Sequence, residues 1–342
     1  MTARVRQVEI KQLRYFKRVA DAGSVSRAAA ALSVAQPAVS RQIANLEEAL
    51  GTPLFFRNGR GVKLTEAGKQ LYAHTSEILE AVRHAEQNVR DTVGVAKGTL
   101  LIGSTPTVIR YLAPPLLRRV AKTHPELDLE FTEGFSGYVN EWLSNGLLDV
   151  AILHDATRTQ HFLTEPLLRE ELVFAVADGT AERTTAPITL TDAANHGLVL
   201  PRRSHGLRLM VERAAAQARL TLVVRSEVDS IEAIKSMVRE DHAATILPRG
   251  AVTPEDGLMV RPISEPMLWR TLILATSSQR PVSQTTRAVI QELKAVVREL
   301  ADEELWPGAE RYSERGPVFT PKTAVAAGAD RTPPADPSQR LA

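Results

Sequence analysis

Apolar positions in the first 64 residues recur at helical spacing in three stretches. The first stretch ends at Gly23, and Ser24 then offers an N-cap for the short second stretch "VSRAAAAL". The third stretch has a single apolar stripe with the spacing of one helix face. The stripes of the first and third stretches are Leu13, Phe16, Val19 and Ala20, and Val39, Ile43, Leu46 and Leu50. This pattern predicts three short helices that bury their apolar faces against one another.

The third predicted helix begins within "SVAQPAVSRQI" and has a polar N-terminal face. Pro37 indicates that the helix starts beside Gln36, because proline is tolerated in the first turn and breaks a helix interior. Ser33 and Gln36 also have the spacing of a capping box. The positions expected to face outward are Gln36, Ser40, Arg41 and Asn45. Two helices joined by a tight turn, the second with a polar face, are typical of a helix-turn-helix that inserts into the major groove of DNA.

A hairpin is predicted directly after this helix, in "LFFRNGRGVKLT". Two short runs flank Asn58-Gly59, which is a strong signal for a type I′ turn. The two strands would form a wing that carries Arg57, Arg60 and Lys63. Residues 1–64 are therefore predicted to be a winged helix-turn-helix DNA-binding domain.

A long helix is predicted from a cap at Thr65 to about Gly94. Its apolar positions approximate a heptad seam, which implies a partner helix. These positions are Leu71, Ile78, Val82, Ala85 and Val89. Residues 65–97 are predicted to be a linker helix for dimerisation, and the alternative is that the stripe packs within its own domain.

Strands and helices alternate from Gly98 onward. The run from "TLLIGS" to "LDVAIL" reads as βαβαβ, which implies a parallel sheet with helices on its faces. A second α/β unit runs from "EELVFAVAD" to "GLMVRPI", and "LWRTLILATS" with the helix after it returns to the first unit. The fold class is therefore α/β, with a two-lobed effector-binding domain over 98–306 and a cleft at the carboxyl ends of the strands. Residues 307–342, rich in proline, alanine and polar residues, are predicted to be a disordered tail.

Composition indicates a soluble cytoplasmic protein, with 44% hydrophobic residues, 24% charged residues and a mean hydropathy of -0.13. No apolar run is long enough to span a membrane, and the N-terminus is too charged for a signal peptide. The absence of cysteine excludes disulfides, a thiolate nucleophile and thiolate metal sites. The net charge is only +2, but residues 1–64 contain eleven basic and four acidic residues. That surplus is the kind that attracts phosphate.

The segment "ALSVAQPAVSRQIANLEEALGTPLFFRNGRGVKLTEAG" resembles the DNA-binding region of LysR-type transcriptional regulators. The residues that match the family pattern are Gln36-Pro37-Ala38, Ser40, Leu46-Glu47, Gly51, Leu54-Phe55, Arg57, Leu64-Thr65 and Gly68. The resemblance extends through the linker helix and both lobes to about Leu305, and the two-lobed part is similar to periplasmic binding proteins. "HDA" after "DVAIL", and "LPRRSHGLR", are similar to the subgroup that includes the nitrogen assimilation control protein.

The resemblance implies that base edges and phosphates of double-stranded DNA are contacted from the third helix and the wing. The residues implied are Ser33, Gln36, Pro37, Ser40, Arg41, Arg57 and Arg60. Their chemistry agrees, since arginine can donate two hydrogen bonds to guanine and glutamine can pair with adenine. The plain alternative for Arg41 is an ion pair with Glu48 or simple exposure to solvent. Ala35 departs from the family pattern, where many relatives have Ser or Thr, so a cap or phosphate contact would be missing.

Candidate effector-binding residues lie in two segments: the first belongs to the effector pocket in relatives, and the second stands at the matching place in the second lobe. In "GSTPTVIRYL", Ser104, Thr105 and Thr107 stand at a strand-to-helix junction, where free backbone N–H groups favour an anion such as a carboxylate. The alternative there is ordinary helix capping. In "LPRRSHGLR", the residues Arg202, Ser204 and Arg208 would complete an anion clamp, unless the arginines simply face water. His154 would either reach the cleft or support a strand crossing.

No catalytic constellation, nucleotide loop or compact metal-ligand spacing is present in the sequence. We therefore expect no enzyme activity, no cofactor and no metal. The hypothesis is a regulator that binds an interrupted inverted repeat as a homodimer and tetramer, responds to a small anionic effector and contacts RNA polymerase. The open alternatives are a ligand-independent transcription factor with a vestigial pocket, a solute-binding protein, and an enzyme with an appended DNA-binding module.

Overall fold

The N-terminal domain contains three helices and a two-stranded wing, as predicted. The computed structural model describes residues 7–58, 61–91, 97–154, 161–179, 184–241 and 243–312. The elements of this domain are α1 (Ile10–Ala22), α2 (Val25–Ala31), α3 (Gln36–Leu50), β1 (Phe55–Asn58) and β2 (Gly61–Leu64). Their shared core contains both predicted stripes except Ala20 and Leu50, and adds Leu54 and Phe55 from the entry to the wing. Burial of these apolar side chains stabilises the domain.

The ends of the short helices follow the predicted caps, with one exception. Gly23 ends α1 with a left-handed φ of 59°, and the Ser24 hydroxyl accepts a hydrogen bond from the Arg27 N–H at 3.4 Å. The predicted capping box between Ser33 and Gln36 is wrong, because the N-cap of α3 is Ala35, which makes no side-chain cap bond. Gln36 instead accepts a hydrogen bond from the Ser26 hydroxyl at 3.1 Å, which ties α3 to α2.

The wing is an antiparallel pair whose register runs from Phe55 opposite Leu64 to Asn58 opposite Gly61. Gly59 and Arg60 lie outside the described residues, so the turn type remains a prediction. Gly61 has a φ of 143°, and a Cβ there would lie 2.7 Å from the Gly23 carbonyl oxygen. The wing therefore approaches the end of α1 closely enough to require glycine.

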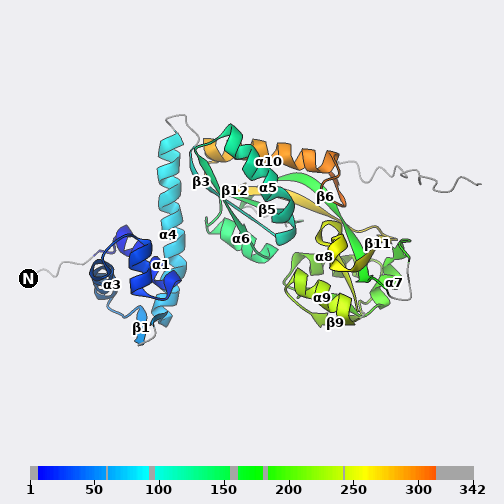
Figure 1. The fold of residues 1–342 in the computed structure, drawn as a ribbon, viewed down its shortest axis with the longest axis horizontal. Coiled ribbons are helices and arrows are strands. Elements are labelled where there is room, and N and C mark those ends of the chain that lie inside the picture. The colour runs from blue at the N-terminus through cyan, green and yellow to red at the C-terminus, as the bar shows by residue number, and fades with distance from the viewer. Residues whose placement is uncertain are drawn as a thin grey trace, which may run out of the picture. The chain divides into compact units, whose positions relative to one another are not determined.

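The linker helix α4 (Glu66–Asp91) starts at the predicted cap, where the Thr65 hydroxyl accepts a hydrogen bond from the Gly68 N–H at 3.0 Å. Figure 1 shows it as one long helix beside α1. Leu71, Tyr72 and Leu79 pack against the core of the N-terminal domain. Ile78 and Val89 are 39% and 69% exposed. The apolar stripe of α4 thus packs against the N-terminal domain near the start of the helix and is exposed to solvent further along. The predicted continuation of the helix to Gly94 lies outside the described residues.

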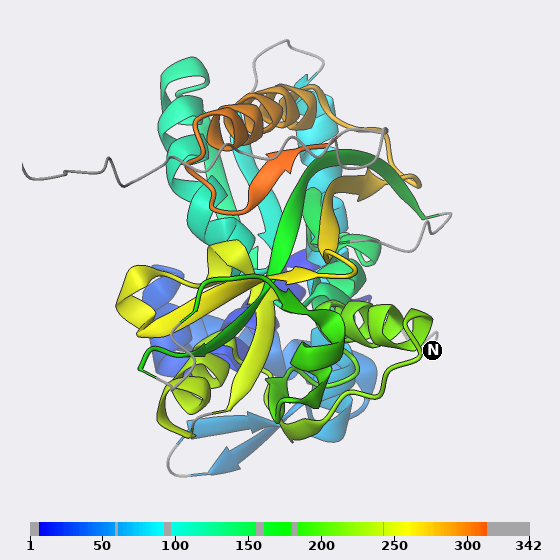
Figure 2. The same cartoon turned by 90° about the vertical axis from the view of Figure 1, so that its right-hand side faces the viewer.

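Lobe I is built on the predicted βαβαβ unit. It comprises β3 (Gly98–Ser104), α5 (Pro106–Thr123), β4 (Leu127–Glu133), α6 (Ser136–Ser144), β5 (Val150–His154), β12 (Trp269–Ser277), α10 (Gln284–Asp302) and β13 (Ala309–Arg311). The strand order is β4-β3-β5-β12, with β3 parallel to both β4 and β5. In Figure 2, α10 (orange) lies beside α5, and Arg119 of α5 binds Glu292 of α10 at 2.6 Å. The pair packs its apolar faces into the lobe I core.

Lobe II is the second α/β unit. It comprises β7 (Ile188–Thr189), α7 (Leu190–Asn195), β8 (Leu198–Leu200), α8 (Gly206–Gln217), β9 (Val224–Glu227), α9 (Ile231–Asp241), β10 (Ala244–Pro248) and β11 (Leu258–Ser264). Short 3₁₀ helices at Arg249–Ala251 and Pro254–Asp256 follow β10. The parallel strands β10, β8 and β9 are neighbours, and their inward side chains form a separate core.

The two lobes share the long strand β6 (Phe162–Ala177). Its first part, Phe162 to Glu171, pairs with β12 in lobe I, and its second part, Leu172 to Ala177, pairs with β10 and β11 in lobe II. The sequence predicted only the second part as a strand. Strand β13 also pairs with β6, so residues 309–311 belong to the lobe I sheet and not to the predicted tail. Residues 313–342 lie outside the part of the chain that the structure describes.

Candidate DNA-binding surface and effector site

The N-terminal face of α3 presents several of the predicted DNA-binding residues. Gln36, Pro37 and Arg41 are exposed, and Ser40 is half-buried beside them. Arg41 makes no ion pair with any described residue, so the alternative pairing with Glu48 is not what the structure has. Ser33 is exposed in the preceding turn with a left-handed φ of 55°. The helix therefore offers donors and acceptors to a partner that approaches this face.

The wing adds a cation and an aromatic ring. Lys63 is exposed on β2, and Phe56, its cross-strand partner on β1, is 63% exposed. Nothing is described of the Arg57 side chain, and Arg60 is outside the described residues, so both assignments stay predictions. Phe56 is a residue that the sequence analysis missed, although its place next to the buried Phe55 in a strand implies the opposite face.

A cavity of about 480 Å³ lies between the two lobes. Its lining comes from the starts of α5, α6 and α9, the end of β4 and the 3₁₀ helix after β10. The lining residues are Pro106, Thr107, Arg110, Glu133, Gly134, Phe135, Tyr138, Trp142, Asp229, Ser230, Ile231, Glu232, Gly250 and Ala251. The volume and the mixture of apolar and polar groups are those of a small-molecule site. Three helix N-termini at one cavity also give it a positive backbone potential.

The three candidates at the β3–α5 junction have different environments. The Ser104 hydroxyl donates a hydrogen bond to the Ile152 carbonyl of the neighbouring strand β5 at 2.8 Å, so it is already used within the sheet. Thr105 is the N-cap residue of α5, yet its buried hydroxyl makes no cap bond and has no partner among the described residues. Thr107 is 7% exposed, lines the cavity and has no side-chain hydrogen bond within the described part of the chain. Ordinary capping therefore does not account for Thr105 or Thr107.

The candidates in "LPRRSHGLR" do not line the cavity. Arg208 is buried, and its guanidinium donates to Glu212 at 2.9 Å, to Glu227 at 3.1 Å and to the Pro201 carbonyl at 3.1 Å. Ser204 is exposed. Arg202 is exposed as well, but its backbone N–H donates to Asp229 at 3.0 Å and so holds one lining carboxylate. The structure thus brings only Thr107, of the predicted effector residues, directly to the cavity wall.

A buried ionic cluster joins the strands that the lobes share. Glu170 of β6 binds Arg270 of β12 at 2.6 Å and accepts from the Trp306 indole N–H at 2.9 Å, while His154 Nε2 is 3.5 Å away. Burial alone would raise the pKa of Glu170, but Arg270 and His154 outweigh it and bring the pKa to about 2. Burial and then Arg270 lower the pKa of His154 to about 4, and the same two causes lower the pKa of His205 to about 4. His154 therefore supports the crossing of the strands.

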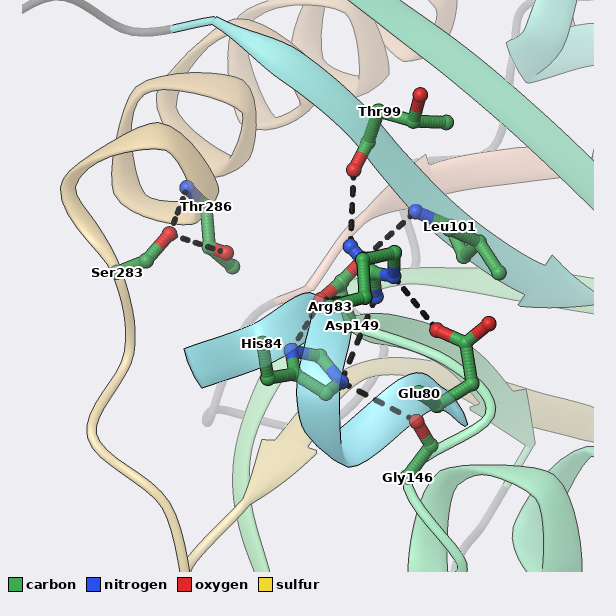
Figure 3. Close-up of polar contacts among 9 residues, drawn as sticks. All are labelled: Glu80, Arg83, His84, Thr99, Leu101, Gly146, Asp149, Ser283 and Thr286. Atoms are coloured by element: carbon green, nitrogen blue, oxygen red, sulfur yellow. Dashed lines mark hydrogen bonds and ion pairs between the residues drawn. The ribbon is translucent and has the colours of Figure 1, made fainter. Parts of the chain in front are cut away.

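The last turns of α4 contact lobe I through a cluster that we call the linker contact, formed by Glu80, Arg83, His84 and Asp149 (Figure 3). Arg83 donates to both Asp149 carboxylate oxygens, at 2.9 and 3.1 Å, and to the Thr99 carbonyl at 3.0 Å. Asp149 also accepts from the Leu101 N–H at 2.8 Å, and His84 Nδ1 is 3.2 Å from it. The Asp149 side chain is only 7% exposed, so this contact is largely shielded from water.

Most of the polar and aromatic lining of the cavity was missed in the sequence. Arg110, Glu133, Tyr138, Trp142 and Asp229 are not among the predicted effector residues. A signal did exist for two of them, because Glu133 ends β4 and Asp229 closely follows β9, and ligands gather at the carboxyl ends of parallel strands. The places of Arg110, Tyr138 and Trp142 could not be predicted, because they depend on which faces of α5 and α6 point toward lobe II.

Within the described ranges, no helix is long and apolar enough to cross a membrane. The same residues contain no group of three or more His, Asp or Glu side chains arranged to hold a metal ion.

A winged helix-turn-helix with an exposed polar helix, in one chain with a two-lobed domain around a small-molecule cavity, is the arrangement of a DNA-binding regulator with an effector-binding domain. Residues 10–69 match the family model for the bacterial regulatory helix-turn-helix protein, lysR family, and residues 94–298 match that for the LysR substrate binding domain. The chain belongs to the LysR family of transcriptional regulators. It is 32% identical over 295 residues to the nitrogen assimilation regulatory protein nac of Klebsiella aerogenes, a match that covers 85% of this chain and 95% of that relative. The subgroup resemblance is thereby confirmed.

Solved structures share the fold. A full-length OxyR variant from Pseudomonas aeruginosa is 25% identical with a TM-score of 0.60, covering 85% of this chain and 98% of that chain. Full-length CbnR in complex with its target DNA is 22% identical with a TM-score of 0.65, covering 85% of this chain and 99% of that chain. The combination of a DNA-binding and an effector-binding domain in this chain is thus that of a LysR-family regulator.

Proposed function

We propose that this regulator binds promoter DNA as a homodimer or tetramer through the α3 face and the wing, and that it responds to an effector with a carboxylate or other anionic group. The observation that carries the effector part is Thr107 at the start of α5, whose side chain lines the cavity and makes no hydrogen bond with any described residue. An anionic ligand oxygen at this helix N-terminus would accept a hydrogen bond from the Thr107 hydroxyl and lie in the favourable field of the helix.

The DNA part of the proposal rests on the exposed Gln36 and Arg41 and the half-buried Ser40 of α3. The CbnR structure, which shares this fold, is a complex with target DNA, and it supports the same use of the domain here. Ser33, Pro37, Arg57 and Arg60 are proposed as further DNA contacts from the family pattern. Tetramer formation and contact with RNA polymerase are proposals of the same origin.

DNA binding is tested by fluorescence anisotropy with duplexes from the region upstream of the protein's own gene. We expect Arg41→Ala to weaken binding by about 5- to 150-fold, the cost of about 1–3 kcal/mol for a lost base contact. Binding by the wild type should also fall steeply with salt, because phosphate contacts release counterions. Arg213→Ala, an exposed arginine on α8, is the matched control. Wild-type binding that is absent, or that does not depend on salt, would contradict the DNA part.

The effector is tested by thermal unfolding with small carboxylates, sulfate, phosphate, aromatic acids and amino acids. A ligand at a hundredfold excess over its Kd should stabilise the fold by about 2.7 kcal/mol. Thr107→Val should reduce this stabilisation, whereas Ser104→Ala should lower stability without changing the ligand effect, because Ser104 bonds to the sheet. If no compound stabilises the wild type, the protein is a ligand-independent transcription factor with a vestigial pocket.

A further inference from the structure

Some of the charged residues that line the interlobe cavity already form ion pairs within the protein, and others do not. Asp229 is held by Arg202, and Glu232 pairs with Lys235 at 2.8 Å. Arg110 and Glu133 line the same cavity and make no hydrogen bond or ion pair through their side chains with any described residue; Arg110 has a longer-range electrostatic interaction with Glu255. The wall therefore offers a ligand one available cation and one available carboxylate. A purely anionic ligand would be opposed by Glu133, and a purely cationic one by Arg110.

The remaining wall beside Glu133 is aromatic. Phe135, Tyr138 and Trp142 all line the cavity, and the rings of Tyr138 and Trp142 stack with their centroids 6.2 Å apart. Gly134 permits this arrangement, because a Cβ there would lie 2.7 Å from the Trp142 ring. Aromatic faces accept apolar groups and also attract organic cations. An ammonium group near Glu133 would therefore meet both a carboxylate and aromatic rings.

We propose that the cavity binds a zwitterionic L-α-amino acid with an apolar or aromatic side chain, which rests on the proposed function of this cavity as the effector site. The ligand carboxylate would be bound by Arg110, the Thr107 hydroxyl and the N-terminus of α5. Its ammonium group would be bound by Glu133. The apolar side chain would lie against the aromatic wall formed by Phe135, Tyr138 and Trp142.

The assignment accounts for three features of the wall with a single ligand. Thr107 gains a hydrogen-bond partner, the available charges of Arg110 and Glu133 are both compensated, and the aromatic rings lose contact with water. A volume of about 480 Å³ is large enough for an amino acid with a large side chain. A site that binds both ends of a zwitterion binds an analogue that lacks one end less tightly, because Arg110 or Glu133 then has no oppositely charged partner in the ligand.

The first test is thermal unfolding of the full chain with L-phenylalanine, L-tryptophan, L-leucine, L-methionine and L-valine. At least one should stabilise the protein. Calorimetry then compares the affinity of L-phenylalanine with the affinities of two analogues: phenylpyruvate, which lacks the amine, and 2-phenylethylamine, which lacks the carboxylate. If another amino acid binds more tightly, its own keto acid and amine are used instead. We expect each analogue to bind at least tenfold more weakly than the amino acid.

Two variants assign the ends of the ligand. Glu133→Gln should weaken binding of the amino acid at least tenfold, so that the amino acid no longer binds more tightly than the keto acid. Arg110→Gln should likewise remove the difference in affinity between the amino acid and the amine. Glu130→Gln, an exposed residue on the same strand β4 outside the cavity, is the control and should change neither value. The proposal is overturned if no amino acid binds, if the keto acid or the amine binds as tightly, or if Glu133→Gln keeps the preference.

Failure of this inference and failure of the proposed function can be told apart in the same preparation. A protein that binds the upstream duplex with a salt-dependent affinity, and is stabilised by a simple carboxylate but not by amino acids, is a regulator with a different effector class. A protein that binds amino acids but no duplex contradicts the DNA part and leaves the cavity assignment in place.

Discussion

The side chain of Glu47 links the end of the recognition helix to the start of the wing. One of its carboxylate oxygens accepts hydrogen bonds from the backbone N–H groups of Leu54 at 2.8 Å and Phe55 at 3.3 Å. Glu47 lies on α3, and the two amides precede and open β1. A single side chain therefore fixes the angle at which the wing leaves α3, and Leu46-Glu47 in the family pattern has a structural reason.

Replacement of Glu47 should loosen the wing before it affects any DNA contact. Glu47→Ala leaves two backbone donors without their acceptor, which costs about 1–3 kcal/mol. We expect amide exchange in the segment 54–64 to accelerate by roughly 5- to 150-fold, the ratio that corresponds to that free energy. Hydrogen–deuterium exchange with mass spectrometry measures it. Glu47→Gln keeps an acceptor oxygen and should show a clearly smaller effect; equal effects of both variants would contradict this role.

At the scale of elements, the linker contact connects helix α4 to strands β3 and β5 of lobe I. Arg83 donates through one terminal nitrogen to both carboxylate oxygens of Asp149, and the two side chains are 24% and 7% exposed; charge-assisted hydrogen bonds shielded from water in this way are stronger than exposed ones. The same helix has an exposed pair, Glu86 with Arg14 of α1, at 3.8 Å with both side chains more than half exposed. The two pairs allow a comparison within one helix.

A double-mutant cycle on Arg83→Ala and Asp149→Asn should give a coupling energy of about 1.5–3 kcal/mol in denaturant unfolding. The cycle on Arg14→Ala and Glu86→Gln should give less than about 1 kcal/mol, because exposed ion pairs contribute little. Similar coupling in both cycles would show that the linker contact does not hold α4 on lobe I in solution.

Two buried histidines near Arg270, His154 at the end of β5 and His205 at the N-cap of α8, predict a dependence of stability on pH. His154 and His205 have a pKa of about 4 in the folded protein, below the value of about 6.5 expected when unfolded. As the pH falls below about 6.5, the unfolded chain therefore takes up protons that the folded protein does not, and stability decreases until about pH 4. Each histidine accounts for a loss on the order of 3 kcal/mol over that interval.

This dependence is measured by denaturant unfolding between about pH 7 and about pH 5, the range in which an unfolded histidine becomes charged. The free energy of unfolding of the wild type should rise with pH. His154→Gln removes one of these two histidines and should flatten the curve, whatever its effect on stability at neutral pH. A slope that is identical in the wild type and this variant would contradict the assignment.

At the scale of the whole molecule, the exposed part of the α4 stripe supports self-association. Ile78 is 39% exposed on a helix whose neighbouring apolar residues Leu71 and Leu79 pack inward. Ile78→Asp places a charge in the proposed seam, so it should shift the protein from dimer toward monomer in sedimentation velocity and weaken duplex binding. Gln70→Asp, an exposed polar position on the same helix, should leave both unchanged. A dimer that persists in Ile78→Asp would place the contact elsewhere.

Prediction from the sequence succeeded where the signal was local. Pro37 and the spacing of Val39, Ile43 and Leu46 set the start and the buried face of α3, and Thr65 capped α4 as expected. The Ser33 capping box failed because the neighbouring turn places Ser33 in a left-handed conformation, two residues before the cap. Of the effector candidates at the strand-to-helix junction, Thr107 lines the cavity and Thr105 does not, and their contact with a ligand stays a prediction. The structural role of Arg208 could not be predicted locally, because it depends on Glu227 of strand β9.

The sequence by itself determined the family, the element types and the polar face of α3, because each depends on residues within a few turns of one another. The tertiary structure decided how β6 is divided between two lobes, which carboxylates already have a cation, and which side chains meet at the cavity. Arg110 and Asp229 are more than a hundred residues apart, and no periodicity along the chain relates them. Their proximity results from strand pairing and lobe packing, which fix distances in space that the local pattern of residues does not contain.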